Sequence, residues 1–251
     1  MWSVTQLCDT VHIVRCWNSA ILRFNSTTHQ QLTSINIKDM IDPFDIVACQ
    51  QTSQIYVAGD EECIWRVSAD GEDIRRWLPK SPSDTLKPFR LSVTSTRLLV
   101  TSHITHQLRQ FDADGNELRC VQLQDDMELK HAVESPTGTF IISQYNSELK
   151  QGQVTQVNND GAVLRHFTGS RLLSLGLTPY IAVDSHGNVI VADCDNDCIL
   201  LLDGQLSLRR VIISRHQLNY EHPYRLCHVE QSGQLLVGMA GQVAVFDVLC
   251  H

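Results

Sequence analysis

The stretch that decides the fold is residues 179–199, which reads PYIAVDSHGNVIVADCDNDCI. Two short apolar runs, 180–183 and 189–192, are separated by a polar turn that contains Gly187. A third apolar run, Ile199–Leu202, follows a second polar turn. Short runs rich in Val and Ile that are bounded by Gly, Asn, Asp and Ser are typical of β-strands. The stretch therefore predicts consecutive antiparallel strands joined by tight turns.

The same pattern recurs along the whole chain at a nearly constant spacing. The most apolar run of each of six units ends at Val14, Val57, Val100, Ile142, Val191 and Val237. The steps between these residues are 43, 43, 42, 49 and 46. Such a period fits a four-stranded propeller blade and is longer than most helical solenoid repeats. We predict an all-β fold: a six-bladed β-propeller of four-stranded antiparallel blades, forming a single domain over residues 1–251. The expected blades span roughly 1–37, 44–78, 88–123, 129–167, 178–213 and 223–250.

Each unit also carries turn signals at matching places. In four units the inner strand opens with proline and an aromatic residue, at Pro43-Phe44, Pro88-Phe89, Pro179-Tyr180 and Pro223-Tyr224. An Asp-Gly pair precedes the fourth strand in four units, at Asp70-Gly71, Asp114-Gly115, Asp160-Gly161 and Asp203-Gly204. Glycine supplies the positive φ that a tight hairpin requires. These signals predict where each strand begins and ends.

The fourth strands share a central arginine, in Ile74–Trp77, Leu118–Val121, Leu164–Phe167 and Leu208–Val211. Cationic side chains on an outermost strand discourage edge-to-edge aggregation, which explains these arginines better than a nucleic-acid site does. Trp65 and Trp77 fall on strands, and we expect them between blades in the core.

The last unit departs from the pattern, because no fourth strand follows Val243–Phe246. Residues 1–4 look like the inner strand of the first unit. The sixth blade therefore has three strands, or the start of the chain completes it, or the sequence is part of a longer protein. Of these alternatives we favour a simplified closure.

The fifth unit resembles an NHL repeat, in residues 179–184, 187–193 and 196–199. Residues 44–47, 57–60 and 63–64 look like a weaker copy of it. NHL repeats form propellers at the C-terminus of tripartite-motif ubiquitin ligases and related scaffolds. The resemblance implies a non-catalytic platform for recognition, such as the substrate-recognition module of a ubiquitin-ligase-type assembly.

Composition narrows the class of ligand and the compartment. The net charge of −8 disfavours a general affinity for nucleic acid, whose phosphates need a basic surface. The nine cysteines are scattered with no C-x-x-C spacing, which indicates reduced thiols and a cytoplasmic protein. The longest aliphatic run is far shorter than the roughly 20 residues of a membrane helix, and residues 1–6 do not resemble a secretory signal.

No complete catalytic or metal-binding set is evident, and we expect neither a metal nor another cofactor. Asp193, Asp195 and Asp197 have the spacing of a calcium loop, but Cys198 stands where that loop needs glycine. His103 and His106 lack a third ligand. The positions around the predicted channel mouth are Asp45, Arg90, His131, Ile181 and Arg225. A ring of such mixed charge would repel a dication about as much as attract it, so a metal-dependent lactonase- or lyase-like enzyme is an alternative that we do not favour.

One face of the predicted propeller carries the loops that leave each fourth strand and those that join second to third strands. Fourteen acidic and seven basic residues fall in these loops. An acidic face favours a protein or peptide ligand over RNA, which stays a second alternative. Aromatic and arginine side chains are typical anchors of peptide sites. The candidate ligand-binding residues are Trp17, Phe44, Arg90, His131, Tyr180, Tyr220 and Arg225. If Arg90 and Arg225 are exposed anchors, their replacement by Glu should leave the melting temperature nearly unchanged.

Overall fold

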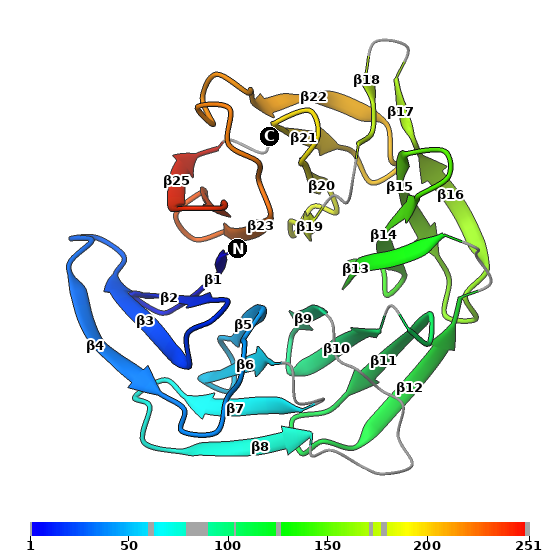
Figure 1. Ribbon diagram of the computed structural model, residues 1–251. Coiled ribbons are helices and arrows are strands. Elements are labelled where there is room, and N and C mark those ends of the chain that lie inside the picture. The colour runs from blue at the N-terminus through cyan, green and yellow to red at the C-terminus, as the bar shows by residue number, and fades with distance from the viewer. Residues whose placement is uncertain are drawn as a thin grey trace.

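The computed structural model describes residues 2–59, 63–78, 90–102, 104–123, 127–170, 173–176 and 180–248. These residues form β-strands and turns and contain no helix. Six antiparallel sheets surround a central axis, so that each sheet is one blade of a propeller (Figure 1). The predicted fold, a six-bladed β-propeller, is confirmed.

The strands of each blade are numbered in chain order from the central axis outward. Blade 1 consists of β1 (Trp2–Leu7), β2 (Thr10–Arg15), β3 (Ala20–Asn25) and β4 (Gln31–Asn36). Blade 2 consists of β5 (Asp45–Cys49), β6 (Gln54–Ala58), β7 (Ile64–Ser68) and β8 (Ile74–Leu78). Blade 3 consists of β9 (Arg90–Thr94), β10 (Arg97–Ser102), β11 (Gln107–Phe111) and β12 (Glu117–Gln122). Blades 4 to 6 are built from β13 (Glu128–Glu134), β14 (Phe140–Asn146), β15 (Gln151–Val157), β16 (Val163–Phe167); β19 (Tyr180–Val183), β20 (Val189–Asp193), β21 (Cys198–Leu202), β22 (Leu208–Ile213); and β23 (Arg225–Val229), β24 (Gln234–Gly238), β25 (Val243–Asp247).

The apolar runs that revealed the repeat are the second strands of the six blades. Between blades 4 and 5 the chain adds a short hairpin, β17 (Gly169–Ser170) and β18 (Leu173–Ser174). This hairpin lies within the longest step of the repeat, 49 residues, and accounts for its extra length.

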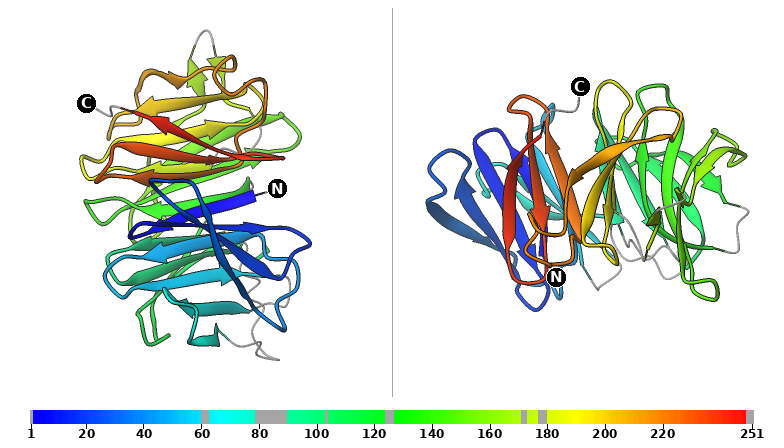
Figure 2. Two further views of the ribbon diagram at one scale, coloured as in Figure 1. Left: turned by 90° about the vertical axis from the view of Figure 1, so that its left-hand side faces the viewer. Right: turned by 90° about the horizontal axis from the view of Figure 1, so that it is seen from above.

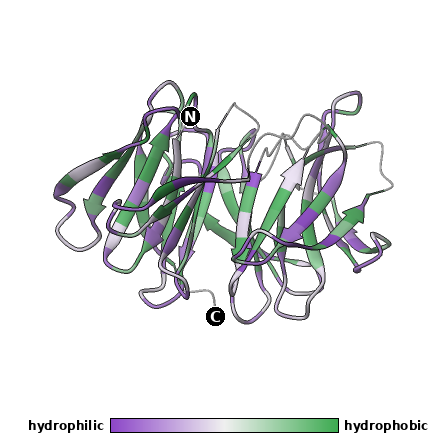
Figure 3. Cartoon of the chain, turned by 90° about the horizontal axis from the view of Figure 1, so that it is seen from below, coloured by the Kyte–Doolittle hydropathy of each residue, from purple (hydrophilic) through white to green (hydrophobic). Residues whose placement is uncertain are grey.

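The hydrophobic core is divided among the gaps between neighbouring blades. Six clusters of buried apolar side chains occupy the six gaps. Figure 3 shows that hydrophobic residues concentrate on the strands, where they alternate with hydrophilic ones, while the connections are mostly hydrophilic or neutral. Trp65 packs between blades 1 and 2, and Trp77 packs between blades 2 and 3. Their predicted place in the inter-blade core is confirmed.

Alternating strand direction sorts the connections onto two faces (Figure 2). We call the face where each inner strand begins the entry face. It holds the loops between second and third strands and the links from one blade to the next. The opposite face, the exit face, holds the turns between first and second and between third and fourth strands.

The predicted Asp-Gly turns form in blades 2, 3 and 4, where the glycine has a φ between 82° and 93°. Blade 5 differs from the prediction: Leu206, with a φ of 58°, takes the left-handed conformation, and Gly204 does not. Asp203 fixes this turn, because its carbonyl and carboxylate accept the backbone N–H groups of Leu206 and Ser207. The turn has the same width as those of blades 3 and 4, but Asp203 stands at its start, where they have Asp112 and Asn158, so Leu206 takes the position that glycine has in those blades.

The sixth blade has three strands among the described residues, in the order β23-β24-β25. The ring closes where β1, the inner strand of blade 1, packs against blade 6 through Val4 and Leu236. The backbones approach so closely that a Cβ on Gly238 would lie 2.4 Å from the carbonyl oxygen of Trp2. The predicted three-stranded sixth blade is thus what the described residues show.

Some predicted features fall outside the described residues. These are the proposed strand opening at Pro88-Phe89, Pro179, His103, and the loop acids and bases at positions 60–62, 80, 84, 87, 125, 126 and 171.

Candidate functional site

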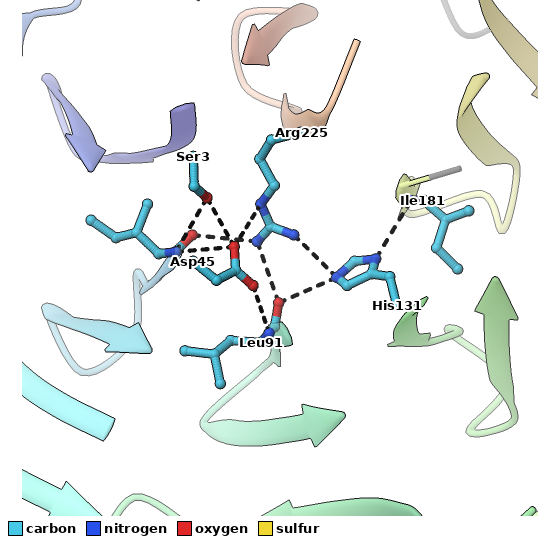
Figure 4. Close-up of polar contacts among 7 residues, drawn as sticks. Ser3, Asp45, Leu91, His131, Ile181 and Arg225 are labelled. Atoms are coloured by element: carbon cyan, nitrogen blue, oxygen red, sulfur yellow. Dashed lines mark hydrogen bonds and ion pairs between the residues drawn. The ribbon is translucent and has the colours of Figure 1, made fainter. Parts of the chain in front are cut away.

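The inner strands of a propeller hydrogen-bond to a neighbour on one side only, so their other edge leaves N–H and C=O groups facing the central axis. Buried backbone groups of this kind need partners. At the entry-face end of the axis, side chains from several blades supply them (Figure 4). We call the side chains of Ser3, Asp45, His131 and Arg225 the hub.

Asp45 is the acidic member of the hub and is fully buried. Its carboxylate accepts hydrogen bonds from Ser3 Oγ at 2.8 Å, from the backbone N–H of Ile46 at 3.0 Å and from that of Leu91 at 2.7 Å. Arg225 Nε lies 3.2 Å from Asp45 Oδ1 and completes a buried ion pair. One carboxylate therefore connects blades 1, 2, 3 and 6.

Arg225 is the basic member and is 5% exposed. Its guanidinium donates to the carbonyl oxygens of Ile46 and Leu91, both at 3.3 Å. A second nitrogen, Nη1, lies 3.1 Å from His131 Nε2. The planar fork of arginine suits this role, because it places several donors in fixed directions.

His131 completes the hub from blade 4 and is 2% exposed. Its Nδ1 lies 3.5 Å from the backbone nitrogen of Ile181, in blade 5. Burial, and next the charge of Arg225, lower the pKa of His131 well below its usual value. The imidazole is therefore neutral at pH 7, which allows a guanidinium to lie against it. With Ile181, the hub and the backbone groups it binds come from all six blades.

Three of the other predicted residues surround the hub. Arg90 is 6% exposed, and its guanidinium lies 5.0 Å from the ring centre of Tyr180 and 5.8 Å from that of Phe44. Arg225 lies 5.8 Å from the ring centre of Tyr180 on the same cluster. Cation–π contacts of desolvated arginines are among the stronger ones. Phe44, Arg90, His131, Tyr180 and Arg225 thus form one cluster, as the prediction of a common site requires.

The burial of that cluster gives it a structural role. Arg90, His131, Tyr180 and Arg225 are each at most 6% exposed, so little of their surface is offered to a ligand. The hub instead satisfies backbone groups and joins the blades. The expectation that Arg225 could be replaced without loss of stability conflicts with this geometry, because Arg225 is paired with a fully buried carboxylate.

Below the hub, the central channel forms a cavity of about 510 Å³. Valine and alanine side chains line its wall, Arg225 and His131 lie at its inner end, and Ser95, Asp184 and Glu230 lie in turns of the exit face. Glu230 is engaged there, since its carboxylate accepts the backbone N–H of Ser185 at 2.6 Å. The cavity therefore extends from the hub toward the exit face.

The other two predicted residues, Trp17 and Tyr220, lie on the entry face, where exposed apolar side chains gather. Trp17 is 87% exposed in the β2–β3 loop, and Tyr220 is 56% exposed in the link between β22 and β23. Ile41, Ile104 and Leu149, which sequence reasoning did not select, are exposed in other loops of the same face. The only signal for them was an apolar residue within a polar connection.

The remaining large apolar side chains that are exposed in the described residues lie on the outermost strand of a blade. They are Leu32, Leu118, Val163, Leu164, Val211 and Val245. In the described part of the chain, no turn of the exit face carries one. The two faces are therefore chemically different.

Local contacts fix the backbones that present Trp17 and Tyr220. Trp17 has a φ of 72°, and its N–H donates to Asp42 Oδ1 at 3.1 Å, which ties the loop of blade 1 to the link before blade 2. Tyr220 has a φ of 59°, and its hydroxyl lies 2.9 Å from His216 Nδ1. The guanidinium of Arg215 lies 5.3 Å from the ring centre of Tyr220. Such left-handed residues cost energy and are maintained by their surroundings.

The charge of the entry face keeps its predicted sign in the described residues. Eight of the fourteen acids and four of the seven bases lie within the described residues. Asp193, in the former calcium-loop candidate, accepts the N–H groups of Gly176 and Asn196 and so caps the loop itself. Burial raises the pKa of its carboxyl group. In the described part of the chain, no group of three His, Cys, Asp or Glu side chains is placed to hold a metal.

Comparison with solved structures shows the fold class. A chain in the crystal structure of a nidogen/laminin complex matches with a TM-score of 0.70 and 12% identity, over 90% of this chain and 83% of that chain. A protein of unknown function from Bacteroides caccae matches with a TM-score of 0.69 and 14% identity, over 94% of this chain and 89% of that chain. No family model and no curated protein matches the sequence. Similarity at this level of identity shows the fold alone, a six-bladed β-propeller. Among the described residues, no helix is long and apolar enough to cross a membrane.

Proposed function

We propose that this propeller is a non-catalytic module that binds a protein or peptide on its entry face, with Trp17 and Tyr220 as anchors. The observation that carries the proposal is the distribution of exposed apolar groups. Five of them lie in entry-face loops, while the described turns of the exit face carry none. An exposed aromatic group surrounded by polar residues is typical of a binding hot spot.

The preferred ligand is an extended or loop-like segment with aromatic or aliphatic residues and a positive charge. The excess of acids on the entry face supports the positive charge, because complementary potentials speed and orient association. The same excess disfavours RNA. The fold also serves protein binding elsewhere, since a similar propeller was solved in a nidogen/laminin complex.

The proposal extends to the class and compartment of the protein. Residues 179–199 support a propeller of the NHL type, and with it a recognition role in a ubiquitin-ligase-type assembly. No disulfide joins any two of the eight cysteines in the described residues, which supports a reducing compartment such as the cytoplasm. The use of the channel residues as a structural hub supports the absence of catalysis at that mouth.

Peptide selection on the purified 251-residue chain tests the proposal. Phage-displayed random peptides are selected, and the best one is labelled for fluorescence anisotropy. Trp17→Ala and Tyr220→Ala should each weaken its binding about tenfold or more, as expected for anchor residues. Leu118→Ala is the matched control, because Leu118 is 52% exposed but lies on β12.

Binding that resists both anchor substitutions, or that Leu118→Ala weakens as much, would refute the assignment of the entry face. A labelled oligouridylate provides the RNA arm. Tight binding to it at about 50 mM salt that collapses at about 200 mM would favour RNA instead.

A further inference from the structure

The outermost strand of blade 6 differs from its counterparts. In each of the other five blades, the third strand pairs with a second strand on one side and with a fourth strand on the other. Among the described residues, β25 pairs only with β24. In the part of the chain that the structure describes, its outer edge is therefore a free edge of the sheet.

Hydrogen bonds at the two ends of β25 show which backbone groups that edge offers. The N–H of Met239 donates to the carbonyl of Gln242, and the N–H of Val248 donates to the carbonyl of Gly233. In an antiparallel pair, residues alternate between bonding the partner and facing away. Val243, Val245 and Asp247 therefore direct their N–H and C=O groups away from β24.

The side chains of this edge lack the protection seen on the other outermost strands. Four of the fourth strands carry arginine at their middle, whereas β25 reads VAVFD and has no basic residue. Val245 is 41% exposed, while the third strands of blades 2 to 5 are mostly buried. A largely apolar edge without basic side chains is a template for another strand.

The gap between blades 6 and 1 lacks a contribution that the other gaps have. In each other gap, the fourth strand of the preceding blade contributes one buried apolar residue. These residues are Ile35, Trp77, Val121, Phe167 and Ile213. In the gap between blades 6 and 1 no such residue is present in the described chain, and Leu22, Phe24 and Val243 are only partly buried.

The register of blades 3, 4 and 5 shows where the missing residue belongs. Val121 pairs with Leu108, Phe167 with Val154 and Ile213 with Ile199. The third-strand residue of each pair also lies opposite a residue of the second strand. That second-strand residue directly follows the end of the apolar run that marks the repeat, at Val100, Ile142 or Val191. In blade 6 that place is held by Val243, which pairs with Gly238.

We infer that the free edge of β25 binds an extended segment of a partner protein as the fourth strand of blade 6. The segment runs antiparallel to β25 over about six residues, as the other fourth strands do, and places a bulky apolar residue opposite Val243. Its backbone pairs with Val243, Val245 and Asp247, and alternate side chains give specificity. This surface is separate from the entry face of the proposed function.

A second copy of this chain fits the edge less well. The outer rim of the ring is convex (Figure 1), so two copies joined edge to edge would touch along little more than one strand of five residues. A stable interface needs about 1,000 Å² or more. A separate peptide strand at the outer edge of blade 6 would instead lie between blades 5 and 1, so that side chains on both of its faces would be buried.

The test uses the 251-residue chain and a labelled peptide that copies residues 162–168, AVLRHFT, which contain the fourth strand of blade 4. Fluorescence anisotropy measures its binding, and hydrogen exchange follows the amides of Val243, Val245 and Asp247. We expect saturable binding with slower exchange at these three amides. A peptide with Ser in place of its Phe should bind about tenfold more weakly, since it lacks the residue for the gap.

Val245→Pro is the decisive variant, because it removes an N–H that faces away from β24 and leaves the pairing with β24 intact. It should weaken binding about tenfold or more relative to Val245→Ala, which keeps that N–H. Equal binding by the two variants, no saturation up to about 1 mM peptide, or unchanged exchange would overturn the inference. A dimer of the free protein that Val245→Pro dissociates would show that the occupant is a second copy. Trp17→Ala should leave peptide binding unchanged, so the result is independent of the entry-face proposal.

Discussion

Replacing Arg225 by methionine should destabilise the propeller strongly. The substitution keeps most of the side-chain volume and removes the charge that compensates Asp45, which is fully buried. It also removes the donors for two backbone carbonyls. Loss of one partner of a buried ion pair costs about 3–5 kcal/mol. For a domain of this size that corresponds to a fall in melting temperature of about 6–20 °C.

The matched control is Arg209→Met. Arg209 Nε and Asp203 Oδ2 are also 3.2 Å apart, but the arginine is 65% exposed. Because exposed pairs contribute about 0–1 kcal/mol, this variant should unfold almost as the wild type does. Equilibrium unfolding in urea, followed by tryptophan fluorescence, gives both free energies.

A double variant separates the ion pair from the rest of the hub. Asp45→Asn alone should also destabilise, while Arg225→Met combined with Asp45→Asn should lose less than the sum of the two single losses, because neither charge is then buried without a partner. If Arg225→Met unfolds within about 1 kcal/mol of the wild type, the hub does not stabilise the ring and the reasoning fails.

Three further predictions concern other parts of the molecule. Burial lowers the pKa of His12 to about 4, so the folded state binds fewer protons than the unfolded state, and the free energy of unfolding should fall by about 3 kcal/mol between about pH 6.5 and pH 4. His12→Gln should make the free energy of unfolding less dependent on pH in urea titrations at several pH values. An unchanged pH dependence would contradict this prediction. Gly238→Ala should destabilise the protein by about 1–3 kcal/mol in thermal melts, because the added Cβ meets a backbone carbonyl where the ring closes. The control is Gly241→Ala, whose Cβ meets nothing within 4 Å and which should leave stability unchanged. Equal effects of the two variants would count against the contact at Gly238. Trp77→Ala should lower the free energy of unfolding by about 3–5 kcal/mol, since the ring packs edge-on against two aromatic rings in the core. Trp17→Ala should leave the melting temperature within about 1 °C of the wild type. A larger shift would mean that Trp17 supports the fold.

The fold could be predicted from the sequence because a blade is a local structure. The apolar runs that end at Val57 and Val191 each lie within a few residues of the turns and strands that they pair with. Strand period and turn chemistry act over that range, and the repeat then fixes the number of blades. Leu206 shows the limit of such rules, since the position of the left-handed residue depended on how Asp203 bonds the turn.

The sequence predicted where the residues of the candidate site lie, but only in part whether they are exposed or buried and what they contact. Asp45, His131 and Arg225 were correctly placed at the mouth of the channel. Their mutual contacts depend on residues up to 180 positions apart and on the backbone groups that face the axis. No local pattern reveals whether an arginine at such a mouth is exposed or neutralised by a buried carboxylate. The sequence indicates that blade 6 lacks a fourth strand. The effect of this on the gap between blades 6 and 1 could be recognised only from the packing of all six blades.

The hub has a consequence for cooperativity. In an open repeat protein each unit contacts only its neighbours, so the array can come apart one unit at a time. Here Arg225 of blade 6 bonds groups of blades 2, 3 and 4, none of which is next to blade 6 in the ring. Opening a single blade would therefore leave charged and polar groups of distant blades without partners. The six repeats should melt together, as one thermodynamic unit.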